Sequence, residues 1–444
     1  MTADREYWRD VYRRFDPEDA PEQRAWRVER KYSPAAIIAA KLRGGLAEPR
    51  VVLVGTRGTG KTTELYRVAD EVGPDRIALY LDVHRHLQDR VADSAAIDLL
   101  KPWEVMALIG LATVRVGTEF FGSPAIRDEV QRFEAALRRL YPEEAPAAVD
   151  VAKLAGGLLV GVAGAVTGAL GTGLHLLAPL AAAADWRIPI GRRTQPADEQ
   201  DARVRELVDS INHLIQGLHR NGRRSVLLLD GLDRVTREDT AADLFVRSSL
   251  FSQLGFNATI LVGPVCLRRR GLLGALRGFA AQVVHEVPVL DPANPSEPGA
   301  GVAFFEEVWE RRTHDLTGPG LPSEVVRRAA YYSGGRTRTF QRIIRELAEG
   351  AYAGQAVNTA DAIDGVLQQL RLEIEEGVTR ADVDVLRGVM EDPRRLPGDV
   401  ERVADLLDRY LLYPYPNQST WYYPNPLLLL GPLLGRVGFD GSST

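Results

Sequence analysis

Residues 51–63 read Val51-Val52-Leu53-Val54-Gly55-Thr56-Arg57-Gly58-Thr59-Gly60-Lys61-Thr62-Thr63. Four apolar, β-forming residues lead into a glycine-rich loop. A helical pattern follows, and its apolar face is formed by Leu65, Val68, Ala69 and Val72. A strand, such a loop and a helix are the context in which G-x-x-x-x-G-K-[ST] binds phosphate. The stretch therefore predicts a phosphate-binding loop, here called the P-loop (residues 55–63).

The residue types in the P-loop suit a nucleotide. Glycines let backbone N–H groups turn inward around phosphate oxygens, and the start of the following helix adds partial positive charge. The Lys61 ammonium can reach the β- and γ-phosphates, and the Thr62 hydroxyl can bind Mg²⁺. A chance match in a glycine-rich chain is the alternative, and the flanking strand and helix argue against it. We expect ATP to contact Gly55, Thr56, Arg57, Gly58, Thr59, Gly60, Lys61, Thr62 and Thr63.

The bulk composition excludes several classes of protein. A chain of 444 residues predicts roughly two to four structural units. Its net charge of −5 does not favour general nucleic-acid binding. Cys266 is the single cysteine, which excludes a disulfide framework and a cysteine-rich metal site. A reducing cytoplasm is the expected compartment, because the first residues contain no apolar signal region.

Two acids follow a second apolar run, Ser225-Val226-Leu227-Leu228-Leu229. Such a run is typical of a strand buried on both faces of a parallel sheet, and we expect it beside the P-loop strand. Asp230 would hold Mg²⁺ through water, and Asp233 would polarise the attacking water. A surface ion pair of Asp233 with Arg234 is the alternative. A Glu is more usual at this position, so slow turnover is expected, which suits a switch better than a motor.

Two groups of arginines are candidates for contacts to the γ-phosphate. Arg338 ends the segment Ser333-Gly334-Gly335-Arg336-Thr337-Arg338, and we expect it to reach the nucleotide when the surrounding helices close on the core. Arg336 competes for this role, and a solvated helix face is the alternative. A second group, of which any member could serve a neighbouring subunit as an arginine finger or be part of a charged loop, consists of Arg268, Arg269 and Arg270.

The chain divides into four expected segments. Residues 1–48 form an N-terminal helical segment, and residues 49–290 form an α/β P-loop NTPase core with a parallel sheet. A helical insertion interrupts the core at about 86–198. Residues 291–375 form a helical lid after a linker rich in Pro and Gly. Residues 376–444 combine two helical patterns with two short aromatic strands, which is typical of a winged-helix-like module.

An apolar stretch within the insertion, 154–184, contains no Asp, Glu, Lys or Arg. Lys61 and Asp230 flank it in sequence and must meet around one nucleotide, so any membrane crossings must be even in number. Two crossings would need about 40 residues, which is more than the stretch provides. The alternatives are a re-entrant or interfacial hairpin that contacts a membrane, and a Gly/Ala-rich hairpin buried against the fold or a second subunit.

Together these motifs resemble AAA+ and STAND ATPases over about 33–375. The segment that ends at Arg338 is similar to the sensor-2 segment of origin-recognition ATPases. Asp230-Gly231-Leu232-Asp233 is similar to the NACHT branch. The following Arg234 and the apolar insertion are similar to KAP NTPases, whose insertion carries transmembrane helices. Two features depart from these patterns: Arg234 replaces the acid usual in NACHT proteins, and Val262-Gly263-Pro264 lacks a clear sensor-1 polar residue.

The resemblance implies an Mg²⁺-dependent ATPase that acts as a switch. Mg-ATP would close core and lid, and the closed form would bind a partner protein or further copies of the chain, with bacterial signalling or phage defence as the implied setting. A DNA-binding initiator or loader is one alternative; the last 60 residues contain few Lys or Arg, and prolines interrupt the hairpin, so nucleic acid is not the favoured partner. A membrane-associated KAP-like NTPase is the other alternative.

Overall fold

The computed structural model describes residues 2–17, 24–44, 48–73, 75–91, 94–141, 150–164, 174–177, 197–269, 271–357, 360–394, 400–416 and 420–435. The chain separates into two compact units. The sheet unit comprises Pro34–Gly55 and Glu64–Val283. The helical unit comprises Met1–Ser33, Thr56–Thr63 and Val284–Thr444. Each unit is described by itself below.

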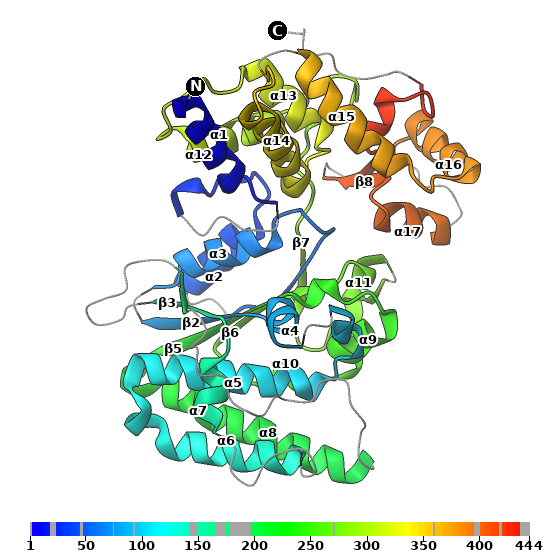
Figure 1. The fold of residues 1–444 in the computed structure, drawn as a ribbon. Helices are drawn as coiled ribbons and strands as arrows, with labels where there is room; N and C mark the ends of the chain where they lie inside the picture. The colour runs from blue at the N-terminus through cyan, green and yellow to red at the C-terminus, as the bar shows by residue number, and fades with distance from the viewer. Residues whose placement is uncertain are drawn as a thin grey trace. The chain divides into compact units, whose positions relative to one another are not determined.

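A seven-stranded sheet is the centre of the sheet unit (Figure 1), and its order is β4-β3-β2-β5-β6-β1-β7. Five strands are parallel, and β3 and β4 at one edge are antiparallel. The strands are β1 (Arg50–Val54), β2 (Arg76–Asp82), β3 (Val160–Gly164), β4 (His175–Leu177), β5 (Arg224–Asp230), β6 (Ala258–Gly263) and β7 (Ala280–Val283).

This order corrects one expectation from the sequence. The strand that ends at Asp230 is not the neighbour of the P-loop strand, because β6 lies between β5 and β1. All six residues of β6 are buried, which fits a central position in the sheet. Asp230 nevertheless ends β5, and the P-loop begins directly after β1. Both strands run parallel to β6 in the same sheet.

Strands β1, β2, β5 and β6 are buried on both faces, as their nearly continuous apolar sequences predict. Alternate side chains, such as Val52, Leu79 and Leu227, form one core with apolar side chains of α5, α6 and α8. Tyr80 faces the other side, where its ring lies against Tyr66 of α3. The helices that complete this unit are α2 (Pro34–Gly44), α3 (Lys61–Asp70), α4 (Val83–Val91), α5 (Pro102–Phe121), α6 (Arg127–Leu140), α7 (Val151–Gly156), α8 (Ala197–Leu218), α9 (Glu238–Ala242), α10 (Leu250–Gln253) and α11 (Cys266–Arg269).

The insertion is helical only in part, which corrects the prediction for 86–198. Within the apolar stretch, β3 pairs with β2 on one side and with β4 on the other. Val160 and Val162 point into the apolar core, whereas a side chain on Gly161 would lie only 2.9 Å from Tyr80 Cβ. The described part is thus a sheet edge, as in the buried-hairpin alternative; 165–173 and 178–184 lie outside the described residues. Among the helices described, none combines the length and apolar character that a membrane span requires.

The helical unit has a core built from both ends of the sequence. Trp8 and Val11 on α1 form a buried stripe with Phe15, which directly follows the helix, and the Phe15 ring lies 5.5 Å from Trp309 and 6.3 Å from Phe340. The helices are α1 (Thr2–Arg14), α12 (Val302–Thr313), α13 (Ser323–Tyr332), α14 (Thr337–Tyr352), α15 (Ala360–Glu375), α16 (Arg380–Glu391) and α17 (Val400–Asp408).

The last described elements form the predicted winged-helix-like arrangement. After α16 and α17, strands β8 (Leu412–Tyr415) and β9 (Trp421–Pro424) pair as an antiparallel hairpin. Tyr415 and Trp421 stack across it at 5.0 Å, and both side chains are buried. Pro414 is tolerated because a two-stranded hairpin consists of edge strands. The predicted fold class, an α/β P-loop-type sheet core with a helical part and this C-terminal module, is confirmed.

Candidate nucleotide-binding site

The P-loop connects β1 to α3 and has the backbone form that its glycines predict. Gly58 and Gly60 adopt φ angles of +89° and +92°, which L-residues with a side chain rarely adopt. A Cβ atom on Gly58 would also lie 2.9 Å from Arg338 Cβ, and one on Gly60 would lie 2.9 Å from a guanidinium nitrogen of Arg30. Both positions therefore favour glycine for conformation, and Gly58 favours it also for space, because Arg338 Cβ cannot move as freely as the end of the Arg30 side chain.

Lys61 is buried and bent back over its own loop. Its ammonium donates to the Thr56 carbonyl oxygen at 2.9 Å, and the Thr59 hydroxyl donates to the same oxygen at 2.9 Å. These bonds hold a cation among backbone groups of the loop. The donor set, an ammonium, loop N–H groups and the Thr62 hydroxyl, suits a phosphate with an associated hard cation.

A buried acid, Glu286, lies at the P-loop in the helical unit. Its carboxylate accepts a hydrogen bond from the Thr56 hydroxyl, and the Glu286 residue is only 2% exposed. Sequence reasoning missed Glu286, which lies 230 residues after Thr56 in the chain. β7 ends at Val283, so Glu286 lies outside the strands of the sheet.

Arg336 presents its guanidinium to the P-loop backbone. It donates to the Arg57 carbonyl, and it lies over the ring of Tyr410 at 3.8 Å and near that of Tyr413 at 5.7 Å. The residue is buried, so this charge depends on the carbonyl and on the aromatic faces. The stacking joins the loop to the segment that contains the C-terminal hairpin.

Thr337 and Arg338 reach the next residue of the loop. The Thr337 hydroxyl donates to the Gly58 carbonyl at 2.8 Å, and the Arg338 backbone N–H points to the same oxygen at 3.4 Å. The Arg338 side chain instead donates through Nε to the Pro17 carbonyl at 3.0 Å. The Arg336 guanidinium thus bonds to the P-loop, and the Arg338 Nε bonds to Pro17.

Asp230 ends β5 in the sheet unit, and both of its oxygens have a donor. Oδ1 accepts the Gly231 N–H at 2.7 Å, and Oδ2 accepts the Tyr80 hydroxyl at 3.1 Å. Asp230 is 4% exposed, so these bonds offset part of the cost of burying a carboxylate. Burial, and then the charge of Asp230, raise the pKa of Tyr80 well above its usual range, so Tyr80 is a neutral donor.

A third acid, Asp82, adjoins this group. It ends β2 in register with Asp230, and its Oδ1 accepts the Arg85 N–H at 2.9 Å, which caps α4. Burial raises the pKa of Asp82; the Arg85 bond opposes this, and the charge of Asp233 adds to it. Sequence reasoning assigned no role to Tyr80 or Asp82. The available signal was that two apolar strands both end in Asp.

The remaining predicted side chains are placed as follows. Asp233 and Arg234 are half-buried on a short 3-10 helix, Leu232–Arg234, directly after Gly231. Arg268 is half-buried on α11, Arg269 ends that helix, and Arg270 lies outside the described residues.

A cation at Asp230 would depend on ligands other than protein acids. Within the described ranges, no group of three or more His, Cys, Asp or Glu side chains is arranged to hold a metal. Mg²⁺ commonly takes one or two protein oxygens and completes its shell with water and phosphate oxygens. The oxygens of Thr62 and Asp230 are of the kind that Mg²⁺ takes, so the residue chemistry fits this metal.

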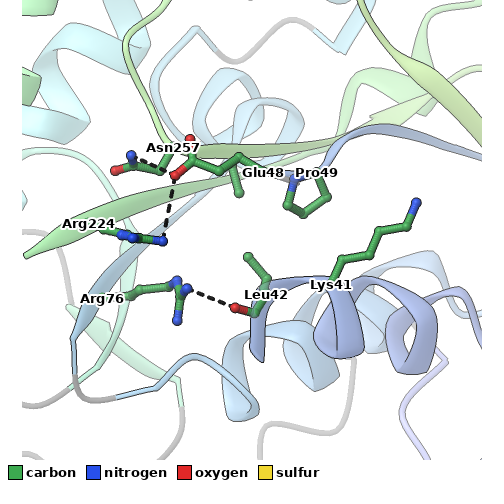
Figure 2. A pocket seen from close by; sticks show the side chains of 8 residues that line it. Lys41, Leu42, Glu48, Pro49, Arg76, Arg224 and Asn257 are labelled. Atoms are coloured by element: carbon green, nitrogen blue, oxygen red, sulfur yellow. Dashed lines mark hydrogen bonds and ion pairs between the residues drawn. The ribbon is translucent and has the colours of Figure 1, made fainter. Parts of the chain in front are cut away.

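A pocket of about 240 Å³ lies at the opposite edge of the sheet, beside the amino ends of β1, β2, β5 and β6 (Figure 2). Two of its basic groups contact protein acceptors: Arg76 donates to the Leu42 carbonyl at 2.8 Å, and Arg224 lies 3.9 Å from Glu48. Glu48 also accepts from the Asn257 amide at 3.0 Å. This pairing gives no reason to place a ligand there.

Comparison with known proteins gives a likeness in structure only. No family model and no curated protein matches the chain. The ORC1 protein of Aeropyrum pernix in complex with DNA is 13% identical, with 93% of each chain covered and a TM-score of 0.40. The ORC2 protein of the same organism in its ADP form is 14% identical (94% of each chain, TM-score 0.39), and its ADPNP–ADP complexes are 12% identical (96%, 0.40). A likeness at this level is too weak to transfer a function, a partner or a site residue.

Proposed function

We propose that this chain is a switch that binds Mg-ATP and hydrolyses it slowly. The carrying observation is that Arg336 and Thr337, at the start of α14, hydrogen-bond to the P-loop carbonyls of Arg57 and Gly58. A nucleotide that reorders these loop residues would therefore change the contacts of the helical unit. This coupling is what a nucleotide-dependent switch needs.

The proposed roles follow the chemistry of each group. P-loop N–H groups and Lys61 bind the phosphates, and Thr62 and Asp230 hold Mg²⁺, directly or through water. Asp233 orients the attacking water, and an arginine of the 333–338 segment responds to the γ-phosphate. Closure of the lid, residues 291–375, would then expose a surface for a partner protein or for self-assembly.

Nucleotide binding and phosphate release by the wild type and by Lys61→Ala test this proposal. Loss of a charge-assisted hydrogen bond is expected to weaken ATP binding about 10- to 100-fold. Lys41→Ala is the matched control, because Lys41 is a half-buried lysine on α2 and is not part of the P-loop sequence. Equal ATP affinity in Lys61→Ala and Lys41→Ala would contradict the P-loop assignment.

A DNA-binding initiator or loader is the second candidate. Its supporting observation is the arrangement of α16, α17 and the β8–β9 hairpin, which is winged-helix-like. A gel-shift titration at a stated salt concentration, with and without ATP, separates the two candidates. Binding that weakens steeply with salt and requires ATP would favour the initiator, and absence of binding at low salt would leave the switch.

A further inference from the structure

A buried tyrosine adjoins the acid that is proposed to hold the metal. Tyr80 lies on β2, opposite Leu228 of β5, and its hydroxyl donates to Asp230 Oδ2 at 3.1 Å. Tyr80 is 3% exposed. A buried hydroxyl must keep a partner, so this bond constrains both side chains.

The hydroxyl of Tyr80 is connected to the helix of the P-loop. Tyr66 and Tyr80 meet edge to face, with ring centroids 5.2 Å apart, and their hydroxyls form a hydrogen bond. Tyr66 lies one helical turn after Thr62 on α3. A chain of hydrogen bonds therefore runs from α3 through Tyr66 and Tyr80 to Asp230, and all three residues belong to the sheet unit.

Strand β3, which pairs with β2, limits the position of the Tyr80 ring. Any side chain at Gly161 would approach Tyr80 Cβ to 2.9 Å and Cδ1 to 3.0 Å, so the backbone of β3 lies directly against this residue. The antiparallel pairing of Tyr80 with Gly161 sets that contact. The ring is thus confined between Tyr66 on α3 and the edge of the sheet.

We propose that Tyr80, supported by Tyr66, is a positioning residue that fixes the Asp230 carboxylate for Mg²⁺; this inference rests on the proposed function. Oδ1 is held by the Gly231 N–H and Oδ2 by Tyr80, so the carboxylate is fixed at both ends. A carboxylate oxygen that accepts one hydrogen bond can also bind a cation, because it carries two lone pairs. A ligand that is already oriented loses less freedom when the ion binds.

The test compares Tyr80→Phe with wild type by binding of a fluorescent non-hydrolysable ATP analogue at a series of Mg²⁺ concentrations. The half-saturating Mg²⁺ concentration is expected to rise about tenfold, as for loss of a residue that orients a metal ligand. Binding of fluorescent ADP in EDTA is expected to be unchanged, because Phe retains the ring and its packing. Tyr66→Phe is expected to shift the Mg²⁺ curve in the same direction by a smaller factor.

Two further variants separate positioning from packing. Asp230→Asn combined with Tyr80→Phe is expected to bind Mg²⁺ no more weakly than Asp230→Asn alone, since the hydroxyl acts through that carboxylate. An unchanged Mg²⁺ curve in Tyr80→Phe, or an equal loss of ADP binding in EDTA, would overturn this inference alone. A wild type that binds no nucleotide under any condition would overturn the proposed function, and this inference with it.

Discussion

Asp230 and Asp233 are three residues apart, but their surroundings differ, and so do the effects expected of their loss. Asp230 is buried with a donor on each oxygen, whereas Asp233 is half-buried on a 3-10 helix. We expect Asp233→Asn to retain Mg-ATP binding and to lose hydrolysis about 100-fold or more, because positioned proton transfer contributes 10²–10⁴-fold. Asp230→Asn should also weaken the dependence on Mg²⁺. If Asp233→Asn releases phosphate at the wild-type rate, another group orients the water, and Asp82 would be the next candidate.

Arg336 and Arg338 are also close in sequence but differ in their contacts. Arg336 donates to the P-loop and stacks on Tyr410, whereas the Arg338 side chain bonds to Pro17. Arg336→Ala is therefore expected to reduce the ATP-induced change in a fluorescence distance pair between the two units more than Arg338→Ala does. ADP affinity should change less than about threefold in Arg338→Ala, because the Arg338 Nε donates to the Pro17 carbonyl. A larger effect of Arg338→Ala would restore the assignment favoured by the sequence.

Asp98 connects its own segment to Thr236 and Arg237, which follow Asp233 in the chain. Its carboxylate accepts hydrogen bonds from the Thr236 N–H and hydroxyl, both at 2.6 Å, and from the Arg237 N–H at 3.0 Å. Burial acts to raise the pKa of Asp98, but these donors outweigh it, and the pKa is lowered. The carboxylate thus stabilises the fold at pH values above its unfolded pKa, and this stability is lost as the pH falls through the folded pKa.

Asp98→Ala is accordingly expected to lower the free energy of unfolding by about 1–3 kcal/mol at pH 7. The difference from wild type should shrink below about pH 4, where the unfolded-state carboxyl is protonated. Urea unfolding at pH 7 and at pH 3 measures both values. Asp243→Ala serves as a control, because the Asp243 carboxylate forms an ion pair with Arg247 on the protein surface. An Asp98→Ala effect of equal size at both pH values would mean that packing, not the charged carboxylate, is responsible.

Features built from contiguous residues could be predicted from the sequence, whereas contacts between distant strands could not. The P-loop followed from local signals, since strand, loop and helix are contiguous, and so did the C-terminal helices and hairpin. Tyr80 and Asp82 could not be found this way, because their role depends on β2 lying beside β5, and neighbouring strands in the sheet are distant in sequence. The 154–184 stretch was ambiguous because glycine and alanine in an apolar run suit a membrane hairpin and a buried strand alike. Spacing also could not distinguish Arg336 from Arg338, since that choice depends on where α14 begins.

The apolar stretch 154–184 affects the whole molecule, and its role in the sheet and its contact with a membrane can be tested separately. Because β3 covers β2 and contacts Tyr80, deletion of 154–184 is expected to expose a strand edge and lower the unfolding midpoint by more than about 5 °C. Flotation of the intact protein with liposomes tests the membrane alternative separately. A deleted protein with an unchanged midpoint and lost flotation would show that the stretch serves a membrane and not the sheet.

The packing of α1 also has a consequence for biosynthesis. The apolar stripe of Trp8, Val11 and Phe15 leaves the ribosome well before its packing partners, because Phe15 packs against Trp309 and Phe340. At about 5–20 residues per second, these partners emerge only after tens of seconds. Meanwhile the sheet unit, whose last residue is Val283, can be completed. Until α12 and α14 have been synthesised, this apolar stripe of the nascent chain is therefore exposed to water. We expect such a segment to be a binding site for a chaperone during that time.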